Sequence, residues 1–526
     1  MNFDPNNPSL LIEHLLAFAI KNGIINRLDT IYMRNRLMEV LCLNESQHDL
    51  PDPDSLPIPK TATPILEAML DYAWQKGLLP DNTLTSRDLL DTAIMGVLMP
   101  KPSEVVNSFN YIKNSQGILA ATEYFYHLSR KCDYIRTERI AKNVEWRHST
   151  LYENLEITIN LTKPEKDPAE IAALKNAPSI DYPKCLLCIE NVGYAGRSNF
   201  PARQTLRTLP IELNKEPWHF QFSPYVYYNH HCIVFSQQHI PMKITEYTFT
   251  RLFDFLEQFP HYFIGSNAGL PIVGGSILNH DHFQGGFHDM PMAKAPVERC
   301  FFSLDFPQVS IGIIKWPMSA LRLHCVDRKP LEMLCAHILK AWESYSDPSI
   351  GVHAFSITKE GLTTPHNAIT PIARKTVEGL FEIDIVFRNN LTSDEHPMGI
   401  FHPHEELHHI KKENIGLIEV MGLFILPGRL QTELNAIKDI LCGKTPYEAI
   451  HNIPKEHPLQ KHHLWINQMV SNFGYNLDDT DANSIIRQTV GNICLEVLHH
   501  SSVFKDAEKG KIAFLRFLES IKIKPQ

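Results

Sequence analysis

One stretch in the middle of the chain combines two pairs of glycines with alternating polar residues, Gly274-Gly275-Ser276-Ile277-Leu278-Asn279-His280-Asp281-His282-Phe283-Gln284-Gly285-Gly286. Alternate residues of a β-strand point to the same face, so a strand here places His280, His282 and Gln284 together. Glycine weakens a strand but allows a ligand to approach the backbone. Because three adjacent polar groups are costly in a core, the pattern favours a ligand-binding strand over an ordinary solvent-facing edge.

The imidazoles of such a strand have three roles open to them: general base, metal ligand or nucleophile. Attack on phosphorus requires a neutral imidazole that is oriented through its other nitrogen, together with donors for the phosphoryl oxygens. Gln284 offers a donor without offering an acidic proton. The residues themselves leave the choice among the three roles open.

Charge and composition exclude several classes of protein. The 526 residues carry a net charge of −9, so the chain lacks a global field that attracts nucleic acid or an anionic membrane. No apolar run approaches the roughly 20 residues that span a bilayer, and the N-terminus lacks the pattern of a secretion signal. We therefore expect a cytoplasmic protein with reduced cysteines and no nucleic-acid or membrane partner.

Cys185 and Cys188 form the one close cysteine pair among ten cysteines. A C-x-x-C spacing in a cytoplasmic protein indicates a metal site or a redox pair. The alternative is two ordinary reduced thiols, since free cysteines often serve as small buried hydrophobic residues.

Hydrophobic spacing predicts an α+β fold with helical ends. We expect a helical region at 1–150, a module with the C-x-x-C pair and the histidine strand at 151–325, a second similar module at 326–430 and a helical extension at 431–526. The expected elements are strands at 155–161, 218–222, 225–235, 379–387 and around 400–404, a helix at 247–259 and a Pro-punctuated connector at 163–183.

His280-x-His282-x-Gln284 resembles the histidine-triad superfamily in the form whose third histidine is glutamine, which marks its hexose-1-phosphate uridylyltransferase branch. Longer strings resemble the bacterial type 2 galactose-1-phosphate uridylyltransferases: 190–197 (ENVGYAGR), 222–225 (FSPY), 260–273 (PHYFIGSNAGLPIV) and 409–422 (HIKKENIGLIEVMG). The resemblance implies two histidine-triad-like modules of antiparallel sheet and helices within the chain. It also implies that two copies of the chain form a homodimer and that no organic cofactor is bound.

The same resemblance implies a double displacement. UDP-glucose gives its uridylyl group to His282, glucose 1-phosphate leaves, and galactose 1-phosphate accepts the group, with Gln284 as the second catalytic residue. The alternatives are a nucleotide phosphorylase or hydrolase of the same superfamily and a zinc-stabilised nucleotide-binding regulator without turnover.

The resemblance also implies metal ligands. A structural zinc is expected on Cys185, Cys188, His239 and His280, with His230 and His231 as rivals of His239. A second metal, iron or zinc, is expected on Glu298, His402 and His404, within a segment that has five histidines in the fourteen residues 396–409. The alternative for that segment is a set of histidines that line the sugar-phosphate pocket or lie on the surface.

Substrate contacts are expected from residues near these motifs. Arg197 and Arg203, with Arg207 nearby, suit diphosphate oxygens, although scattered surface arginines are the alternative. Relatives use the segment of Asn267, Gly275 and Ser276 for the nucleotide phosphates. Lys412, beside Lys411, is expected to neutralise phosphate, the alternative being an exposed lysine at a helix start.

Overall fold

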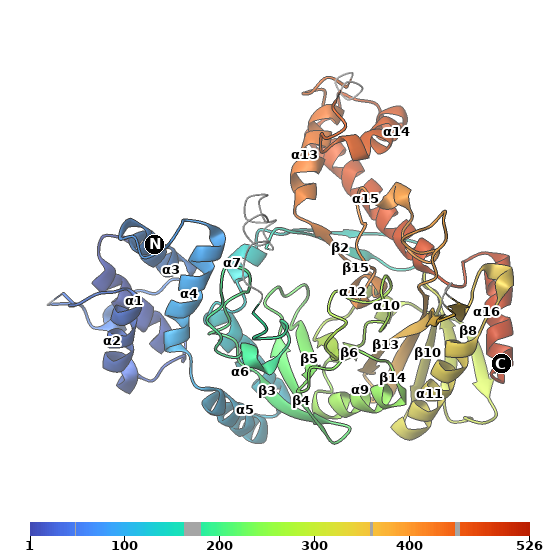
Figure 1. Cartoon of the computed structure of the whole chain (residues 1–526), viewed down its shortest axis with the longest axis horizontal. Coiled ribbons are helices and arrows are strands. Elements are labelled where there is room, and N and C mark those ends of the chain that lie inside the picture. The colour runs from blue at the N-terminus through green and yellow to red at the C-terminus, as the bar shows by residue number, and fades with distance from the viewer. Residues whose placement is uncertain (48, 163–179, 358–360, 448–452) are drawn as a thin grey trace. The chain divides into compact units, whose positions relative to one another are not determined.

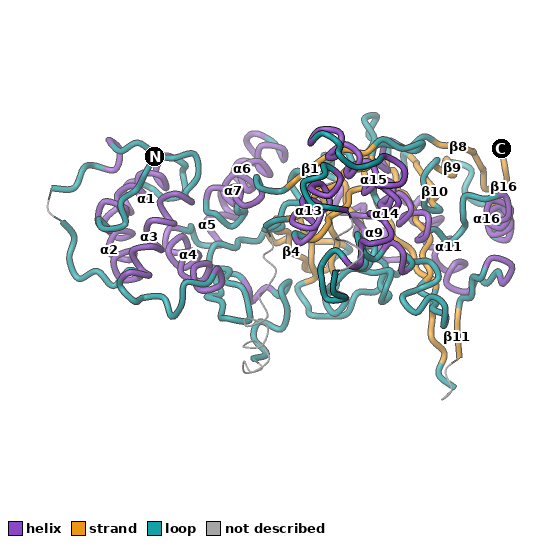
Figure 2. Tube along the Cα trace, turned by 90° about the horizontal axis from the view of Figure 1, so that it is seen from above, coloured by secondary structure: helices purple, strands orange, loops and turns teal. Residues whose placement is uncertain are grey.

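The computed structural model describes residues 1–47, 49–162, 180–357, 361–447 and 453–526, and has the expected α+β composition with helical ends (Figures 1 and 2). The chain divides into two compact units, the first formed by Met1–Lys142 and Lys166–Ile240, the second by Asn143–Glu165 and Pro241–Gln526. The expected connector at 163–183 lies outside the described residues as far as residue 179. The four-part division into domains and the duplicated module stay predictions.

The first unit begins with helices, as the spacing predicted. They are α1 (Pro8–Lys21), α2 (Thr30–Val40), α3 (Thr63–Gln75), α4 (Leu84–Leu98), α5 (Pro102–Gln116), α6 (Ile118–Lys131) and α7 (Thr137–Ile140). An antiparallel series follows, β3 (Leu209–Leu213), β4 (Glu216–Phe222) and β5 (Cys232–Ser236). Phe125 of α6 packs against Phe222 of β4 with ring centroids 5.3 Å apart, so helices and strands of this unit share a core.

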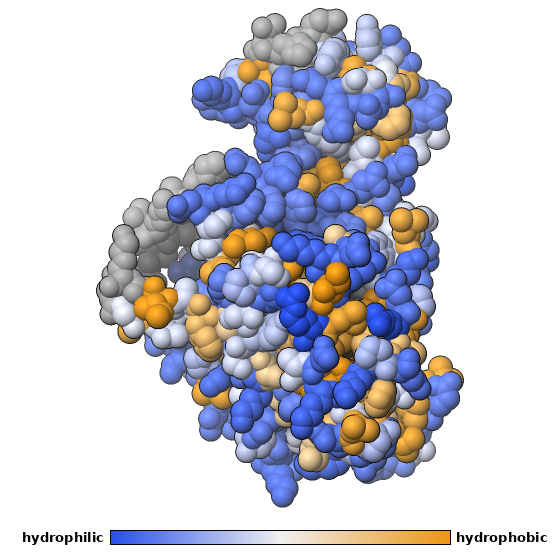
Figure 3. Space-filling view, turned by 90° about the vertical axis from the view of Figure 1, so that its right-hand side faces the viewer, coloured by the Kyte–Doolittle hydropathy of each residue, from blue (hydrophilic) through white to orange (hydrophobic). Residues whose placement is uncertain are grey.

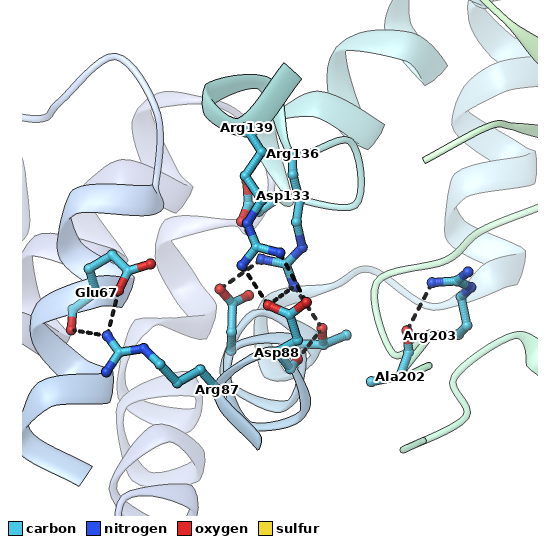
Figure 4. A network of polar contacts seen from close by, with 10 residues as sticks. Glu67, Arg87, Asp88, Asp133, Arg136, Arg139, Ala202 and Arg203 are labelled. Atoms are coloured by element: carbon cyan, nitrogen blue, oxygen red, sulfur yellow. Dashed lines mark hydrogen bonds and ion pairs between the residues drawn. The ribbon is translucent and has the colours of Figure 1, made fainter. Parts of the chain in front are cut away.

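A network of charged side chains joins α4 to the segment that leads into α7 (Figure 4). Arg136 Nη1 lies 3.0 Å from Asp91 Oδ2 and 3.2 Å from Asp133 Oδ2, and Arg139 Nη1 lies 3.0 Å from Asp88 Oδ2. Burial, with Asp91 nearby, raises the pKa of Asp133 to about 8. These arginines bind carboxylates of their own unit, which gives them a structural role.

The second unit holds most of the strands. A small sheet has the order β1 (Val144–His148), β2 (Leu155–Asn160), β15 (Leu423–Pro427), with β2 and β15 parallel. A longer series has the order β16 (Ile523–Pro525), β8 (Val297–Ser303), β9 (Ser310–Ile314), β10 (Ala320–Cys325), β14 (Phe381–Asn389), β13 (Asn367–Lys375), β6 (Phe263–Gly265), β7 (His282–Gly286). Strands β11 (Phe355–Ile357) and β12 (Thr363–Pro365) form a separate hairpin.

The helices of the second unit are α9 (Glu246–Gln258), α10 (Pro291–Lys294), α11 (Arg328–Ser344), α12 (Leu417–Val420), α13 (Arg429–Leu441), α14 (His463–Phe473), α15 (Asp479–Ser501) and α16 (Glu508–Ser520). Helices α9 and α11 cover one face of the longer series. Phe253 of α9 lies against Phe381, and Trp342 of α11 lies 5.0 Å from Phe387, measured between ring centroids. The odd-numbered residues of β14 therefore face these helices, and its even-numbered residues face away.

No described helix is long and apolar enough to span a membrane. Figure 3 views the surface from the side of β8 and α16, where hydrophobic side chains form small separate groups among hydrophilic ones.

Most expected elements are confirmed, and two strands were predicted wrongly. The strands expected at 155–161, 218–222 and 379–387 correspond to β2, β4 and β14, and the helix expected at 247–259 corresponds to α9. The strand expected at 225–235 begins only at Cys232, because Val226 and His230 have positive φ angles of 39° and 53°. The strand expected around 400–404 does not form, and Pro403, which has no N–H for a ladder, lies inside it.

Candidate active site and metal centre

Strand β7 places His282 and Gln284 on the face of the sheet that points away from α9 and α11. The register pairs Gln284 with Gly265, Gly265 with Ile372, and Ile372 with Asp384, so these four residues share one face. Asp384 is an even-numbered residue of β14, and Phe283 is buried on the opposite face. The sheet thus has an apolar, helix-covered face and a polar face that carries the two predicted catalytic residues.

The His282 imidazole is fixed by one hydrogen bond. Its Nδ1–H donates to the backbone oxygen of His280 at 2.8 Å, because a carbonyl can only accept. Burial lowers the pKa of His282 to about 4, and the side chain is 5% exposed. The ring is therefore neutral at pH 7, with its lone pair on Nε2, which is the form that a nucleophile requires.

His280 does not occupy the strand position that the sequence predicted. Strand β7 begins at His282, and His280 precedes it in a bend. Its side chain is fully buried, and its carbonyl orients the imidazole two residues later.

Asn267 holds together the segments on either side of the active strand. Its Oδ1 accepts a hydrogen bond from the backbone N–H of Leu417 at 2.8 Å. A Cβ atom at Gly275 would lie 2.6 Å from Asn267 Nδ2, and one at Gly416 would lie 3.0 Å from Asn267 Oδ1. Glycine is therefore required at both positions for this packing, and Ser276 follows Gly275 as an exposed residue.

The segment 411–417 lies over the same face as Gln284. A Cβ at Gly265, the partner of Gln284 in the register, would approach Leu417 Cδ1 to 2.9 Å. Lys411 is buried and donates to Glu419 Oε1 at 2.9 Å, whereas Lys412 is exposed. Of the two lysines, Lys412 is the one whose charge can serve a phosphate.

The three arginines of the first unit differ in how their guanidinium groups are used. Arg197 donates to Tyr182 O, Ile180 O and Tyr194 Oη, and Arg207 donates to the carbonyls of Pro100, Gln204 and Leu206. Among the described residues, the guanidinium group of Arg203 donates only to Ala202 O at 3.2 Å, a contact that Figure 4 also shows. Arg203 therefore keeps most of its guanidinium donors for a ligand, whereas Arg197 stabilises its own loop and Arg207 ties its turn to Pro100.

Cys185, Cys188 and His239 form a compact group in the first unit. The two Sγ atoms are 3.6 Å apart, too far for a disulfide, and Cys188 Sγ lies 3.1 Å from His239 Nδ1. Asn191 Nδ2 donates at 2.8 Å to the carbonyls of both cysteines, which fixes the turn between them. Burial and the neighbouring Cys185 raise the pKa of Cys188 to about 12 when no cation is bound.

This donor set fits zinc. Two thiols and an imidazole nitrogen, all within 4.8 Å of one another, are three of the four ligands of a Cys₂His₂ tetrahedron. The rivals lie in other surroundings, since His230 pairs with Glu123 at 3.1 Å and His231 lies against Tyr228 with ring centroids 4.4 Å apart.

Among the described residues, the groups of metal-ligand type do not include the predicted set Glu298, His402 and His404, which stays a prediction. His402 is fully buried with its Nδ1 3.3 Å from Pro403 O, and Glu298 lies exposed on β8. Among the described residues, His404 is grouped instead with Glu406 and His500. No sequence pattern indicated His500, because it lies 96 positions after His404, on α15.

Known proteins match the chain over nearly its whole length. Residues 23–241 match the family model described as galactose-1-phosphate uridyl transferase, N-terminal domain, and residues 255–458 match its C-terminal domain. Proteins named galactose-1-phosphate uridylyltransferase are 54% identical in Caldanaerobacter subterraneus subsp. tengcongensis, over 97% of each chain, and 50% identical in Halalkalibacterium halodurans, over 98% of each chain. The one from Bacillus subtilis is 47% identical over 98% of each chain.

No solved structure matches the chain. The family models and the full-length relatives agree with each other and with the polar face of β7, and the chain belongs to the galactose-1-phosphate uridylyltransferase family.

Proposed function

We propose that this enzyme transfers the uridylyl group of UDP-glucose to galactose 1-phosphate, giving glucose 1-phosphate and UDP-galactose, in galactose metabolism. Family membership supports the reaction. The mechanism is supported by the His282 ring, whose Nδ1–H donates to a backbone carbonyl, so that Nε2 bears the lone pair. A buried, oriented, neutral imidazole is suited to attack phosphorus.

In the first half-reaction His282 Nε2 attacks the α-phosphorus of UDP-glucose. The N–P bond forms while the bond between that phosphorus and the bridging oxygen breaks, so glucose 1-phosphate leaves with the electron pair. The Nδ1–H bond to His280 O then stabilises the positive charge on the substituted ring. In the second half-reaction a phosphate oxygen of galactose 1-phosphate attacks the same phosphorus, the N–P bond breaks, and His282 is regenerated.

Gln284 donates its amide N–H to a phosphoryl oxygen in this scheme. It lies two residues after His282 on the same face of β7, where alternate side chains point in one direction. An amide stabilises the developing charge without releasing a proton, so it does not deliver an acid to the wrong leaving group.

Arg203, Lys412, Asn267, Gly275 and Ser276 are proposed substrate contacts, and Arg197 is proposed as a support of its loop. An Arg203→Met variant should raise KM for UDP-glucose roughly tenfold with little change in Tm, since one charge-assisted contact is lost. Arg197→Met is the matched control: its guanidinium is occupied by loop carbonyls, so Tm should fall more than KM rises. If Arg197→Met instead raised KM with little change in Tm, and Arg203→Met mainly lowered Tm, then Arg197 would be the substrate contact and Arg203 the support of the loop.

Zinc is proposed on Cys185, Cys188 and His239, with His280 as the fourth ligand. Bound there, zinc supplies a structural cross-link and performs no chemical step. Metal analysis of the purified chain should find one equivalent of zinc fewer in His239→Ala than in the parent. Unchanged zinc in that variant would mean that another histidine is the ligand, and His280→Ala tests the fourth position in the same way.

Incubation with UDP-glucose alone distinguishes the proposed reaction from its alternatives. The transferase should release one equivalent of glucose 1-phosphate per active site and then stop until galactose 1-phosphate is added. Continuous release of sugar phosphate would indicate a hydrolase or phosphorylase, and no release would indicate a regulator without turnover.

A homodimer in the cytoplasm is the proposed setting of the enzyme. The mass of the purified chain in solution, measured by light scattering, should equal two chains, and a monomer mass at working concentrations would contradict the assembly.

A further inference from the structure

The histidine-rich segment forms a second cluster of metal-ligand type, in a place that the sequence did not predict. His404, Glu406 and His500 each offer a ligand atom, and these atoms lie within 4.8 Å of one another. All three residues belong to the second unit. His404 precedes the short 3-10 helix Glu405–Leu407, and His500 is in the last turn of α15.

The His404 ring is fixed in a way that leaves one nitrogen available. Its Nε2–H donates to Ile400 O at 3.2 Å, so the lone pair is on Nδ1. The ring stacks on His396 with centroids 3.8 Å apart and an interplanar angle of 13°, and its other neighbour is His500 at 4.4 Å. A backbone carbonyl that holds the far nitrogen of an imidazole is the usual support of a metal-binding histidine.

His500 is held from the opposite side. Lys505 Nζ donates to His499 O at 2.9 Å and to His500 O at 2.7 Å, which fixes the end of α15. The Nε2 atom of His500 lies 3.9 Å from Glu406 Oε1, a separation that a cation between the two atoms would bridge. The contact from the His404 N–H to His500 Nδ1 is long, at 3.3 Å, and would be given up when the ring coordinates a metal.

We propose that His404, Glu406 and His500 bind a divalent cation of borderline softness, with Zn²⁺ as the best match, and that water completes its coordination. Two imidazoles and a carboxylate are ligands that such cations prefer over Ca²⁺ or Mg²⁺. The Glu406 carboxylate is exposed, so a cation can enter from solvent. This site shares no residue with Cys185, Cys188 and His239.

The cation would join two segments that are far apart in the sequence. His404 and Glu406 lie in the segment that leads to Lys411 and Lys412, whereas His500 lies in the C-terminal helical region. Because a cation that binds only the folded form shifts the folding equilibrium toward it, Zn²⁺ should raise Tm even when no substrate is present.

The test uses the full chain, stripped with a chelator and titrated with Zn²⁺. The parent should bind one equivalent more than His500→Ala, and Glu406→Gln should bind that equivalent at least tenfold more weakly, since it loses a charged ligand. His499→Ala is the matched control, because the neighbouring His499 ring lies against Tyr152 instead, with centroids 5.6 Å apart. It should bind the same number of equivalents as the parent.

Equal zinc content in the parent and His500→Ala, or a rise in Tm with Zn²⁺ that is as large in His500→Ala as in the parent, would overturn the proposal. A Cys185→Ser background separates the two sites. The equivalent of Zn²⁺ that binds at His404, Glu406 and His500 should still be bound by Cys185→Ser. It should be lost in the double variant Cys185→Ser/His500→Ala. If Cys185→Ser does not fold, the difference between the parent and His500→Ala still decides.

Discussion

The second unit contains two His-x-His patterns whose imidazoles have different surroundings. At 280–282 a short strand begins at the second histidine, whose ring is buried and oriented by a backbone carbonyl. At 402–404 no strand forms, and the Nε2 atom of buried His402 has no hydrogen-bond partner among the described residues. His404 stacks on His396 and lies tilted against His500.

The difference shows that spacing alone does not define a histidine site. The residue between the histidines and the residues after them decide the outcome. Asp281 retains a backbone N–H, whereas Pro403 has none to donate to a neighbouring strand. Gly286 adds no side chain to the face of β7 that carries His282 and Gln284, whereas Glu405 begins a 3-10 turn that brings the Glu406 carboxylate beside His404.

The largest expected effect separates the two patterns by activity. His282→Asn should lower kcat by at least about 10⁴-fold, because the nucleophile is lost, while the fold is retained. His402→Leu should keep kcat within about tenfold of the parent and leave Tm unchanged or higher, because an apolar side chain replaces a buried nitrogen that has no hydrogen-bond partner among the described residues. Steady-state kinetics and thermal unfolding measure both. A loss of activity in His402→Leu as large as that in His282→Asn would remove the distinction.

A smaller effect is expected two residues after the second histidine of each pattern, at Gln284 and Glu406. Gln284→Ala should reduce kcat by roughly 10²-fold to 10³-fold, as expected for one lost donor to a phosphoryl oxygen. Glu406→Gln should leave kcat nearly unchanged in metal-free buffer, since Glu406 belongs to the other cluster. Comparable losses in the two variants would show that both patterns serve the reaction.

The smallest expected effect is on acid stability. His409 donates from Nδ1 to His462 Nδ1 at 2.9 Å, and His462 Nε2 lies 3.0 Å from Glu433. Burial, followed by the neighbouring His462, lowers the pKa of His409 to about 3. Between pH 6.5 and 3 the unfolded chain then binds the extra proton, so the free energy of unfolding falls as pH falls, by at most about 1.4 kcal/mol per pH unit.

His409→Gln keeps an N–H donor but removes this titration. Its free energy of unfolding should therefore decline less steeply from pH 7 to pH 5 than that of the parent, with no difference in slope above pH 7. Urea unfolding at several pH values measures the slope. Parallel curves for the two proteins would show that His409 does not contribute.

Features that depend on nearby residues were predictable from the sequence. Alternation predicted β2 and β14, helical spacing predicted α9, and the Gly-flanked histidine pattern predicted β7, although His280 lies before the strand. The C-x-x-C turn and its partner His239 follow from the family pattern. In contrast, the link from Asn267 to Leu417 joins residues 150 positions apart, and nothing in either segment reveals it. The same holds for His500 beside His404, because tertiary packing sets such contacts.

The arginines illustrate the same limit. Arg197, Arg203 and Arg207 are equivalent in the sequence as phosphate ligands, and only the carbonyls around each guanidinium separate them. The acceptors that a guanidinium group contacts are set by the folded chain and cannot be inferred from the residue's neighbours in the sequence.

We propose that His282, and no other histidine, carries the uridylyl group. The most direct measurement is intact mass spectrometry of the enzyme after mixing with UDP-glucose, followed by localisation of the added group by peptide mapping. We predict a single added uridylyl group per chain, located on His282, lost when galactose 1-phosphate is added and absent in His282→Asn. An adduct on another residue, or turnover to UDP-galactose by His282→Asn at the rate of the parent, would show that His282 is not the nucleophile.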